Sequence, residues 1–218
     1  MDPKAARKYV FSRAVASNRP KSQDCAEVFE RDDKLVVALG DGASGIRGSD
    51  VASATLIEAV RVAVGDRTFA VEDPRKWVTL FEAVDLGLAA HAAGETSGIV
   101  VVVGPGMLLG VSTGDSEAWA VTTTRIDKLT VGQQTKQRLG SRRVTPTSFE
   151  RHALDGVLLV GTDGLFKFAA GDVIAQIVRS SDVGPAAEKL IDLVRLPSGK
   201  LADDAAVVLL RSQASRPS

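Results

Sequence analysis

The chain has 218 residues, with 27 basic and 27 acidic side chains, so its formal net charge is zero. This balance argues against a protein that binds nucleic acid or an anionic membrane through its overall charge. Cys25 is the single cysteine, which excludes an internal disulfide framework and is typical of the reducing cytoplasm. Hydrophobic residues make up 44% of the sequence, enough for a globular core. We expect a cytoplasmic protein with no nucleic-acid or membrane partner.

The first third of the chain predicts strands, and the residues after it predict helices. Short apolar runs separated by polar turns indicate three strands, in "YVFSRAVAS", "CAEVFER" and "LVVALGD". The period then changes, because apolar residues recur at every third or fourth position. This spacing predicts two helices, in "SDVASATLIEAVRVAV" and "DPRKWVTLFEAVDLGLAAHAA".

The rest of the chain repeats the order of strands followed by helices. Strands are predicted in "GIVVVV", "MLLGVST", "EAWAVTTT", "RIDKLT", "LDGVLLVGTDG" and "AAVVLLRS", and helices in "GDVIAQIVRSS" and "PAAEKLIDLVRL". The polar segment "QTKQRLGSRRVTPTS" predicts an irregular, exposed connection. Local hairpins build antiparallel sheets whose outer faces are covered by paired helices. We predict an α+β fold, a four-layer α/β/β/α sandwich with two antiparallel sheets, formed by one domain at 1–211 and followed by a disordered tail at 212–218.

Acidic residues lie at the ends of the predicted strands, beside small residues. They are Asp24, Asp41, Asp115, Asp163, Asp203 and Asp204. Any one of them is also compatible with an ordinary turn. Antiparallel sheets bring strand ends to a common rim, however, where several carboxylates would repel and raise one another's pKa values. Divalent cations relieve such repulsion, so the joint pattern predicts a metal centre at one rim.

Six segments that contain these acids follow one another in an order that is found in a known family. They are "RPKSQD", "LGDGASG", "GETSG", "STGDSEAW", "LLVGTDGLFKF" and "ADDAAVVLL". In this order they resemble the motifs of the metal-dependent protein phosphatases, the type 2C or PPM family, in its compact bacterial form. The resemblance extends from about Arg19 to Leu210. It implies a serine/threonine phosphoprotein phosphatase that acts in signalling on phosphorylated proteins and opposes a Ser/Thr kinase.

The resemblance also implies a set of metal ligands. Asp41 would bridge two Mn²⁺ or Mg²⁺ ions, and the backbone carbonyl of Gly42 would contact one of them directly or through water. Asp163 and Asp203 would hold the other ion. Asp115 with Asp163 would offer a place for a third, weaker ion.

The roles in catalysis follow from the same resemblance. Arg19 would grip the substrate phosphate through its planar fork of donors. Asp24 would support the metal cluster through water or orient Arg19. A hydroxide that bridges the two ions would attack phosphorus, so Arg19, Asp41 and Asp163 are the predicted catalytic residues.

Several departures from the family pattern leave two alternatives open. Gln23 stands where many relatives have Glu, Ala43 where some have His, Ser44 where the motif has Gly, and Glu117 where it has Arg. Gln23, Ala43 and Glu117 would suit a catalytically silent module for signalling or scaffolding. The segment before "RLGS" is also too short for most of the mobile flap of the family. An open cleft of this kind would suit a metal-dependent hydrolase of small phosphate esters.

Overall fold

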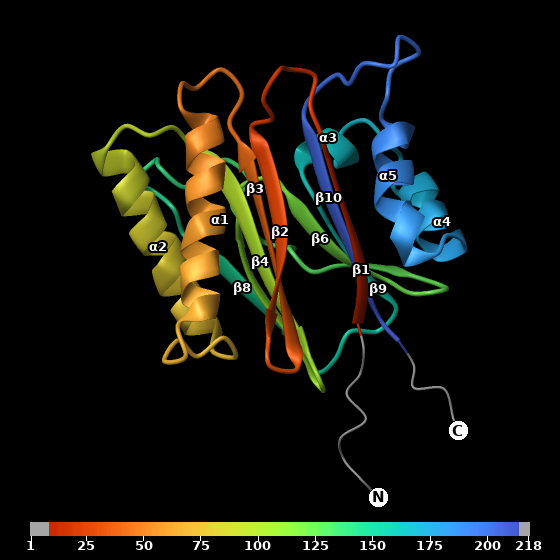
Figure 1. The fold of residues 1–218 in the computed structure, drawn as a ribbon, viewed down its shortest axis with the longest axis horizontal. Coiled ribbons are helices and arrows are strands. Elements are labelled where there is room, and N and C mark those ends of the chain that lie inside the picture. Colours follow the sequence, from red (N-terminus) through yellow and green to blue (C-terminus); the bar gives the residue numbers. More distant parts are fainter. Residues whose placement is uncertain (1–8, 214–218) are drawn as a thin grey trace, which may run out of the picture.

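Two five-stranded antiparallel sheets form the centre of the computed structural model, which describes residues 9–213 (Figure 1). The first sheet has the order β1-β10-β9-β6-β7, and the second has the order β2-β3-β4-β5-β8. The strands are β1 (Tyr9–Ala16), β2 (Asp24–Arg31), β3 (Lys34–Gly42), β4 (Thr96–Gly104), β5 (Met107–Thr113), β6 (Glu117–Val121), β7 (Ile126–Lys128), β8 (Thr147–Arg151), β9 (Val157–Gly161) and β10 (Ala205–Ser212). Ser212, the first residue of the predicted tail, thus ends β10, and residues 214–218 lie outside the described part.

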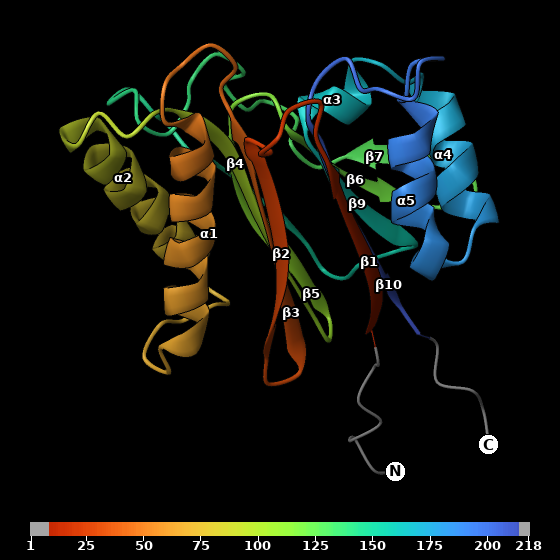
Figure 2. The same cartoon turned by 45° about the horizontal axis from the view of Figure 1, so that its top comes forward.

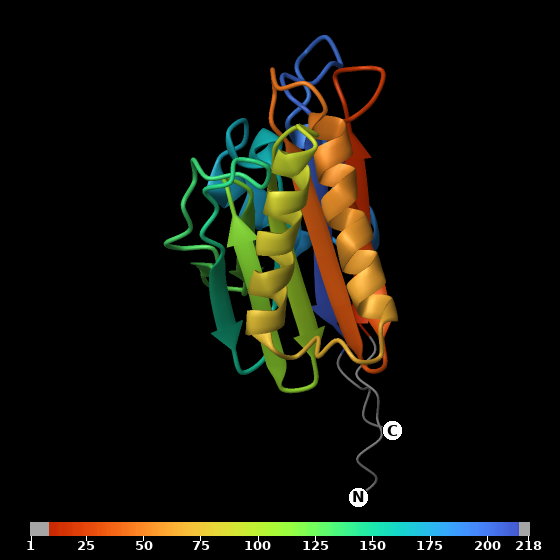
Figure 3. The ribbon, with the colours of Figure 1, turned by 90° about the vertical axis from the view of Figure 1, so that its left-hand side faces the viewer.

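Helices cover the outer face of each sheet, which confirms the predicted α/β/β/α sandwich. They are α1 (Ser49–Gly65), α2 (Pro74–Ala90), α3 (Asp163–Phe166), α4 (Gly171–Ser180) and α5 (Val183–Leu193). The helices α1 and α2 lie side by side on the second sheet (Figure 3), and α4 and α5 cover the first. None of the helices in the described part of the chain is both long and apolar enough to cross a membrane.

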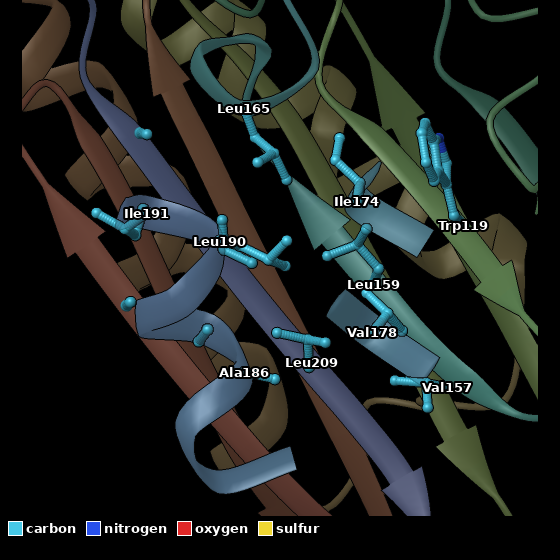
Figure 4. Close-up of a cluster of buried hydrophobic side chains, with 14 of the residues drawn as sticks. Trp119, Val157, Leu159, Leu165, Ile174, Val178, Ala186, Leu190, Ile191 and Leu209 are labelled. Atoms are coloured by element: carbon cyan, nitrogen blue, oxygen red, sulfur yellow. The ribbon is translucent and has the colours of Figure 1, made fainter. Parts of the chain in front are cut away.

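The core consists of three apolar layers, one between the sheets and one under each pair of helices. Alternate side chains of a strand therefore enter different layers. In β10, Val208 and Leu210 point between the sheets, whereas Leu209 packs under α5 beside Leu190 (Figure 4). Because both faces of the central strands are covered, they read as continuous apolar runs in the sequence.

The segment predicted as an irregular, exposed connection is more ordered than expected. Its last two residues begin β8, which pairs with β5 at the edge of the second sheet. Leu139 in its middle is fully buried and exchanges backbone hydrogen bonds with Thr96. The prediction of an exposed connection was therefore wrong for these residues, since one apolar side chain and two backbone bonds anchor an otherwise polar loop.

One end of the sandwich collects the strand ends that carry the predicted acids, and we call this end the rim. There β3 and β9 end, β10 begins, and the turn from β5 to β6 passes from the second sheet to the first. The short helix α3, which follows β9 directly, marks the rim in Figure 2. The sequence pattern does not indicate α3, which is a single turn.

The placement of Leu158 between the sheets can be tested by its stability contribution. Leu158 is fully buried, and Leu158→Ala should lower the free energy of unfolding by about 2–5 kcal/mol because a cavity remains in the core. Leu86 on α2 is 62% exposed, so Leu86→Ala should change it by less than about 0.5 kcal/mol. Urea denaturation followed by circular dichroism measures both variants. Equal losses would contradict the described core.

Candidate metal centre

Three aspartates from distant parts of the sequence meet at the rim and form what we call the acidic cluster. Asp41 belongs to β3 in the second sheet, Asp163 begins α3 directly after β9 of the first sheet, and Asp115 lies in the turn from β5 to β6. One carboxylate oxygen from each lies within 4.8 Å of the other two. The structure thus brings together three of the predicted metal-binding residues, and it takes them from both sheets.

Asp41 lies at the centre of this arrangement. Its Oδ2 accepts hydrogen bonds from the hydroxyl of Ser116 and from the backbone N–H of Asp163, each at 3.4 Å. Burial raises the pKa of Asp41 to about 7, and the negative charges of Asp163 and Asp115 add to this effect. A nearby cation would favour the ionised carboxylate and reverse this shift.

Asp24 supplies an independent sign that the rim suits a cation. It pairs with Asp41 across β2 and β3, and it is 4% exposed. Its Oδ2 has no hydrogen-bond partner among the described residues. Burial raises the pKa of Asp24 well above its usual range, the charge of Asp41 adds to the increase, and a hydrogen bond with Thr162 opposes it. A buried carboxylate oxygen without a partner costs free energy unless a proton or a cation compensates it.

The chemistry of these donors fits a hard divalent cation. The groups that meet at the rim are carboxylate oxygens, and oxygen is the donor that Mg²⁺ and Mn²⁺ prefer in proteins. Two glycines allow the close backbone packing around them. A Cβ on Gly42 would lie 2.6 Å from the carbonyl oxygen of Ser49, and one on Gly164 would lie 1.9 Å from that of Asp204. Larger residues at either position would force the strand ends apart.

Asp203 is a predicted ligand that lies outside the acidic cluster. Its Oδ1 accepts the backbone N–H of Asp204 at 3.0 Å. The charge of Asp203 nevertheless contributes to the raised pKa of Asp41. Asp203 lies two residues before β10 and does not join the closest group of oxygens.

Asp204 has a structural role that differs from that of Asp203. It is 4% exposed and lies against the loop between β1 and β2. Its carboxylate accepts hydrogen bonds from the Ser17 hydroxyl at 2.7 Å and from the backbone N–H groups of Asn18 at 3.1 Å and Gln23 at 2.8 Å. These bonds fix the loop that carries Arg19.

Arg19 lies on the exposed side of this loop, held by neutral acceptors. Its Nη1 donates to Oε1 of Gln23, its Nη2 donates to Oγ of Ser44 at 3.2 Å, and its Nε donates to Asn18 at 3.3 Å. Gln23 and Ser44 are two of the positions that depart from the family pattern. Because neither carries a charge, the positive charge of the guanidinium stays available for an anion.

Two basic residues that the sequence analysis did not single out contact the acidic cluster. Nζ of Lys167 forms an ion pair with Oδ2 of Asp163, and Nη2 of Arg138 lies 3.2 Å from Oδ2 of Asp115. The spacing of four between Asp163 and Lys167 is a signal that the sequence offers, because it puts two side chains on one side of a helical turn. Arg138 carries no such signal, since it reaches Asp115 only through the fold.

Glu117, another departure from the pattern, is occupied away from the cluster. Its Oε2 accepts a hydrogen bond from the indole nitrogen of Trp119 at 2.5 Å and forms an ion pair with Lys128 at 2.9 Å. Its carboxylate thus links β6 to β7. The chain at 129–146, where relatives carry the flap, consists here of turns and bends without a helix.

Other proteins of known structure share this architecture. No protein-family model and no curated protein matches the sequence. Solved structures of bacterial phosphatases do match the fold. The serine/threonine phosphatase Stp1 from Staphylococcus aureus has a TM-score of 0.80 at 17% identity, covering 95% of this chain and 96% of that one. The S. agalactiae serine/threonine phosphatase has a TM-score of 0.81 at 19% identity, covering 94% and 100%.

A third solved structure is that of the PstP catalytic domain, a serine/threonine phosphatase in complex with two manganese ions. It has a TM-score of 0.77 at 20% identity and covers 94% of this chain and 99% of that one. The chain therefore has the fold of the bacterial serine/threonine phosphatases. The resemblance that the sequence motifs indicated is confirmed at the level of the fold.

The raised pKa of Asp41 predicts how the metal-free protein responds to pH. The folded chain holds this proton up to a pH of about 7, whereas an unfolded chain releases it near 3.9. The folded state thus binds more protons between these values, so this contribution to stability should decrease as the pH rises from about 4 to 7. One pH unit between the two pKa values corresponds to about 1.4 kcal/mol, so the effect is on the order of a few kcal/mol.

Thermal unfolding in EDTA across this pH range measures the effect. Asp41→Asn should weaken the pH dependence, because the variant has no carboxyl group to titrate at this position, and the remainder comes from the raised pKa of Asp24. Asp172→Asn, which changes an exposed acid on α4, is the matched control and should leave the dependence as it is. If Asp41→Asn kept the wild-type pH dependence, the raised pKa would be wrong.

Proposed function

We propose that this chain is a metal-dependent serine/threonine phosphoprotein phosphatase. The observation that carries the proposal is the acidic cluster, beside which Asp24, paired with Asp41 across two strands, has a buried oxygen with no hydrogen-bond partner among the described residues. The fold supports it, because similar solved structures are serine/threonine phosphatases and one of them holds two manganese ions.

The acids at the rim would hold the ions. Asp41 would lie between two ions, Asp163 and Asp203 would bind one of them, and the carbonyl of Gly42 would contact the other directly or through water. Asp24 would support the metal cluster through water or orient Arg19. Divalent ions bound there would lower the pKa of water towards neutrality and stabilise negative charge on a phosphoryl group. The donor set suits both Mn²⁺ and Mg²⁺.

Arg19 would bind the substrate phosphate. Its guanidinium is exposed at the rim, and its hydrogen bonds to Gln23 and Ser44 orient it without neutralising it. A planar fork of donors matches two phosphate oxygens better than a lysine would. The substrate would be a phosphorylated protein whose Ser/Thr kinase the enzyme opposes in signalling. The cytoplasmic location expected from the single cysteine stays a prediction.

A catalytically silent relative is the second candidate, and one observation favours it. Lys167 and Arg138 pair with Asp163 and Asp115, so protein cations compensate part of the negative charge without any metal. In that case the chain would keep the phosphatase fold as a signalling or scaffold module. The short chain at 129–146 favours a further variant, a hydrolase of small phosphate esters, because no helical flap would cover the rim.

Activity on a phosphothreonine peptide tests the proposed function. We expect the wild type to need Mn²⁺ or Mg²⁺, and Asp163→Asn to lose activity by at least about 100-fold because an anionic ligand is removed. Asp172→Asn on α4 is the matched control and should retain wild-type activity. A small aryl phosphate, measured at equal metal concentration, should be hydrolysed less efficiently than the peptide.

The other outcomes separate the candidates. Calorimetry that finds Mn²⁺ binding without turnover of either substrate would favour the silent module. Faster turnover of the aryl phosphate than of the peptide would favour the small-ester hydrolase. A chain that binds no divalent ion at millimolar concentration would overturn the proposed function.

A further inference from the structure

Two basic side chains approach the outer edge of the acidic cluster from separate segments. Lys167, which directly follows α3, pairs through Nζ with Oδ2 of Asp163. Arg138 comes from the connection between β7 and β8, and its Nη2 lies 3.2 Å from Oδ2 of Asp115. The two acids that they contact are the pair that the sequence analysis expected to hold a third ion.

The backbone holds both basic residues in place. Lys167 donates its N–H to the carbonyl of Asp163 at 2.8 Å, so the pair lies within one helical turn. Arg138 precedes Leu139, whose side chain is fully buried and whose backbone exchanges hydrogen bonds with Thr96 at 2.9 and 3.0 Å. The Thr96 hydroxyl in turn donates to the carbonyl of Asp41 at 2.9 Å. The backbone thus connects both basic residues to residues of the acidic cluster.

The two basic side chains bring the same positive charge as one divalent ion would. Lys167 and Arg138 together carry two positive charges and direct them at carboxylates whose oxygens lie within 4.8 Å of each other. A dication between Asp115 and Asp163 would have to displace both basic groups or lie beside them. Coulomb repulsion at such short range opposes the second arrangement, and the loss of two ion pairs opposes the first.

We propose that Lys167 and Arg138 replace a third divalent ion at the Asp115–Asp163 pair, so that this chain binds two ions and not three. The inference rests on the proposed function, because it presupposes the two ions at Asp41. It revises the expectation of a third, weaker ion for this particular chain. The two basic residues are positioning residues here, since they act on the acids and not on the substrate.

Counting bound Mn²⁺ tests the inference without relying on activity. The electron paramagnetic resonance signal of free Mn²⁺, followed in a titration into the millimolar range, gives the number of ions bound per chain. We expect two ions for the wild type and three for the double variant Lys167→Met with Arg138→Met, the third binding most weakly. The conservative double variant Lys167→Arg with Arg138→Lys should return the number to two.

A matched control removes the same charge elsewhere. Arg67 and Lys76 are exposed and lie in and after the loop from α1 to α2, at the opposite end of the sandwich. The double variant Arg67→Met with Lys76→Met should bind two ions, as the wild type does. Thermal unfolding of each variant shows that it is folded, and the count for the wild type does not depend on any variant.

Each remaining outcome decides against the inference. Three ions in the wild type, or two in the Lys167→Met and Arg138→Met variant, would contradict the replacement while leaving the two-ion phosphatase intact. A third ion in the Arg67→Met and Lys76→Met control would assign the effect to net charge alone. No bound ion in the wild type would overturn this inference and the proposed function together.

Discussion

Carboxylates that crowd into a partly buried place must be compensated by protons, by metal ions or by basic side chains, and this requirement governs the rim of the sandwich. Asp41 shows it in its pKa, which burial and the neighbouring acids raise to about 7. Asp24 shows it in a buried oxygen that has no partner among the described residues. Lys167 and Arg138 show it in their ion pairs with Asp163 and Asp115. Asp41 and Asp24 therefore need a proton, or a cation that the protein does not itself provide.

The sandwich can gather these charges because its core makes the rim rigid. Three apolar layers fix the two sheets and their helices, so strand ends from both sheets hold their positions against the repulsion. Close packing at Gly42 brings the end of β3 against the start of α1 and the residue before β2, and close packing at Gly164 brings α3 against the residue before β10. Asp204, hydrogen-bonded to the loop between β1 and β2, adds Arg19 to the same rim.

The sequence predicts the acids at the rim because their strands are covered on both faces. All residues of β9, which leads to Asp163, are buried, for example, and such runs are easily recognised as strands. The edge strand β8 could not be recognised, because only Phe149 among its residues is buried and its composition is that of a loop. The sequence also does not show which of the two side chains, Asp203 or Asp204, points towards the β1–β2 loop. Adjacent residues in an extended chain point in opposite directions, so only one of them can do so.

Contacts between distant segments lie beyond what sequence patterns show. Arg138 and Asp115 are 23 positions apart and meet only because Leu139 is anchored to Thr96. Gln23 and Ser44, which appear in the sequence only as departures from the phosphatase pattern, both contact Arg19. A departure that looks like the loss of a ligand can thus support another residue of the same site.

Anomalous diffraction at the manganese absorption edge, from crystals soaked in Mn²⁺, would show whether Asp41 holds divalent ions. We expect two anomalous peaks in contact with the Asp41 carboxylate and none between Asp115 and Asp163. Soaked crystals with no peak at Asp41 would contradict this expectation.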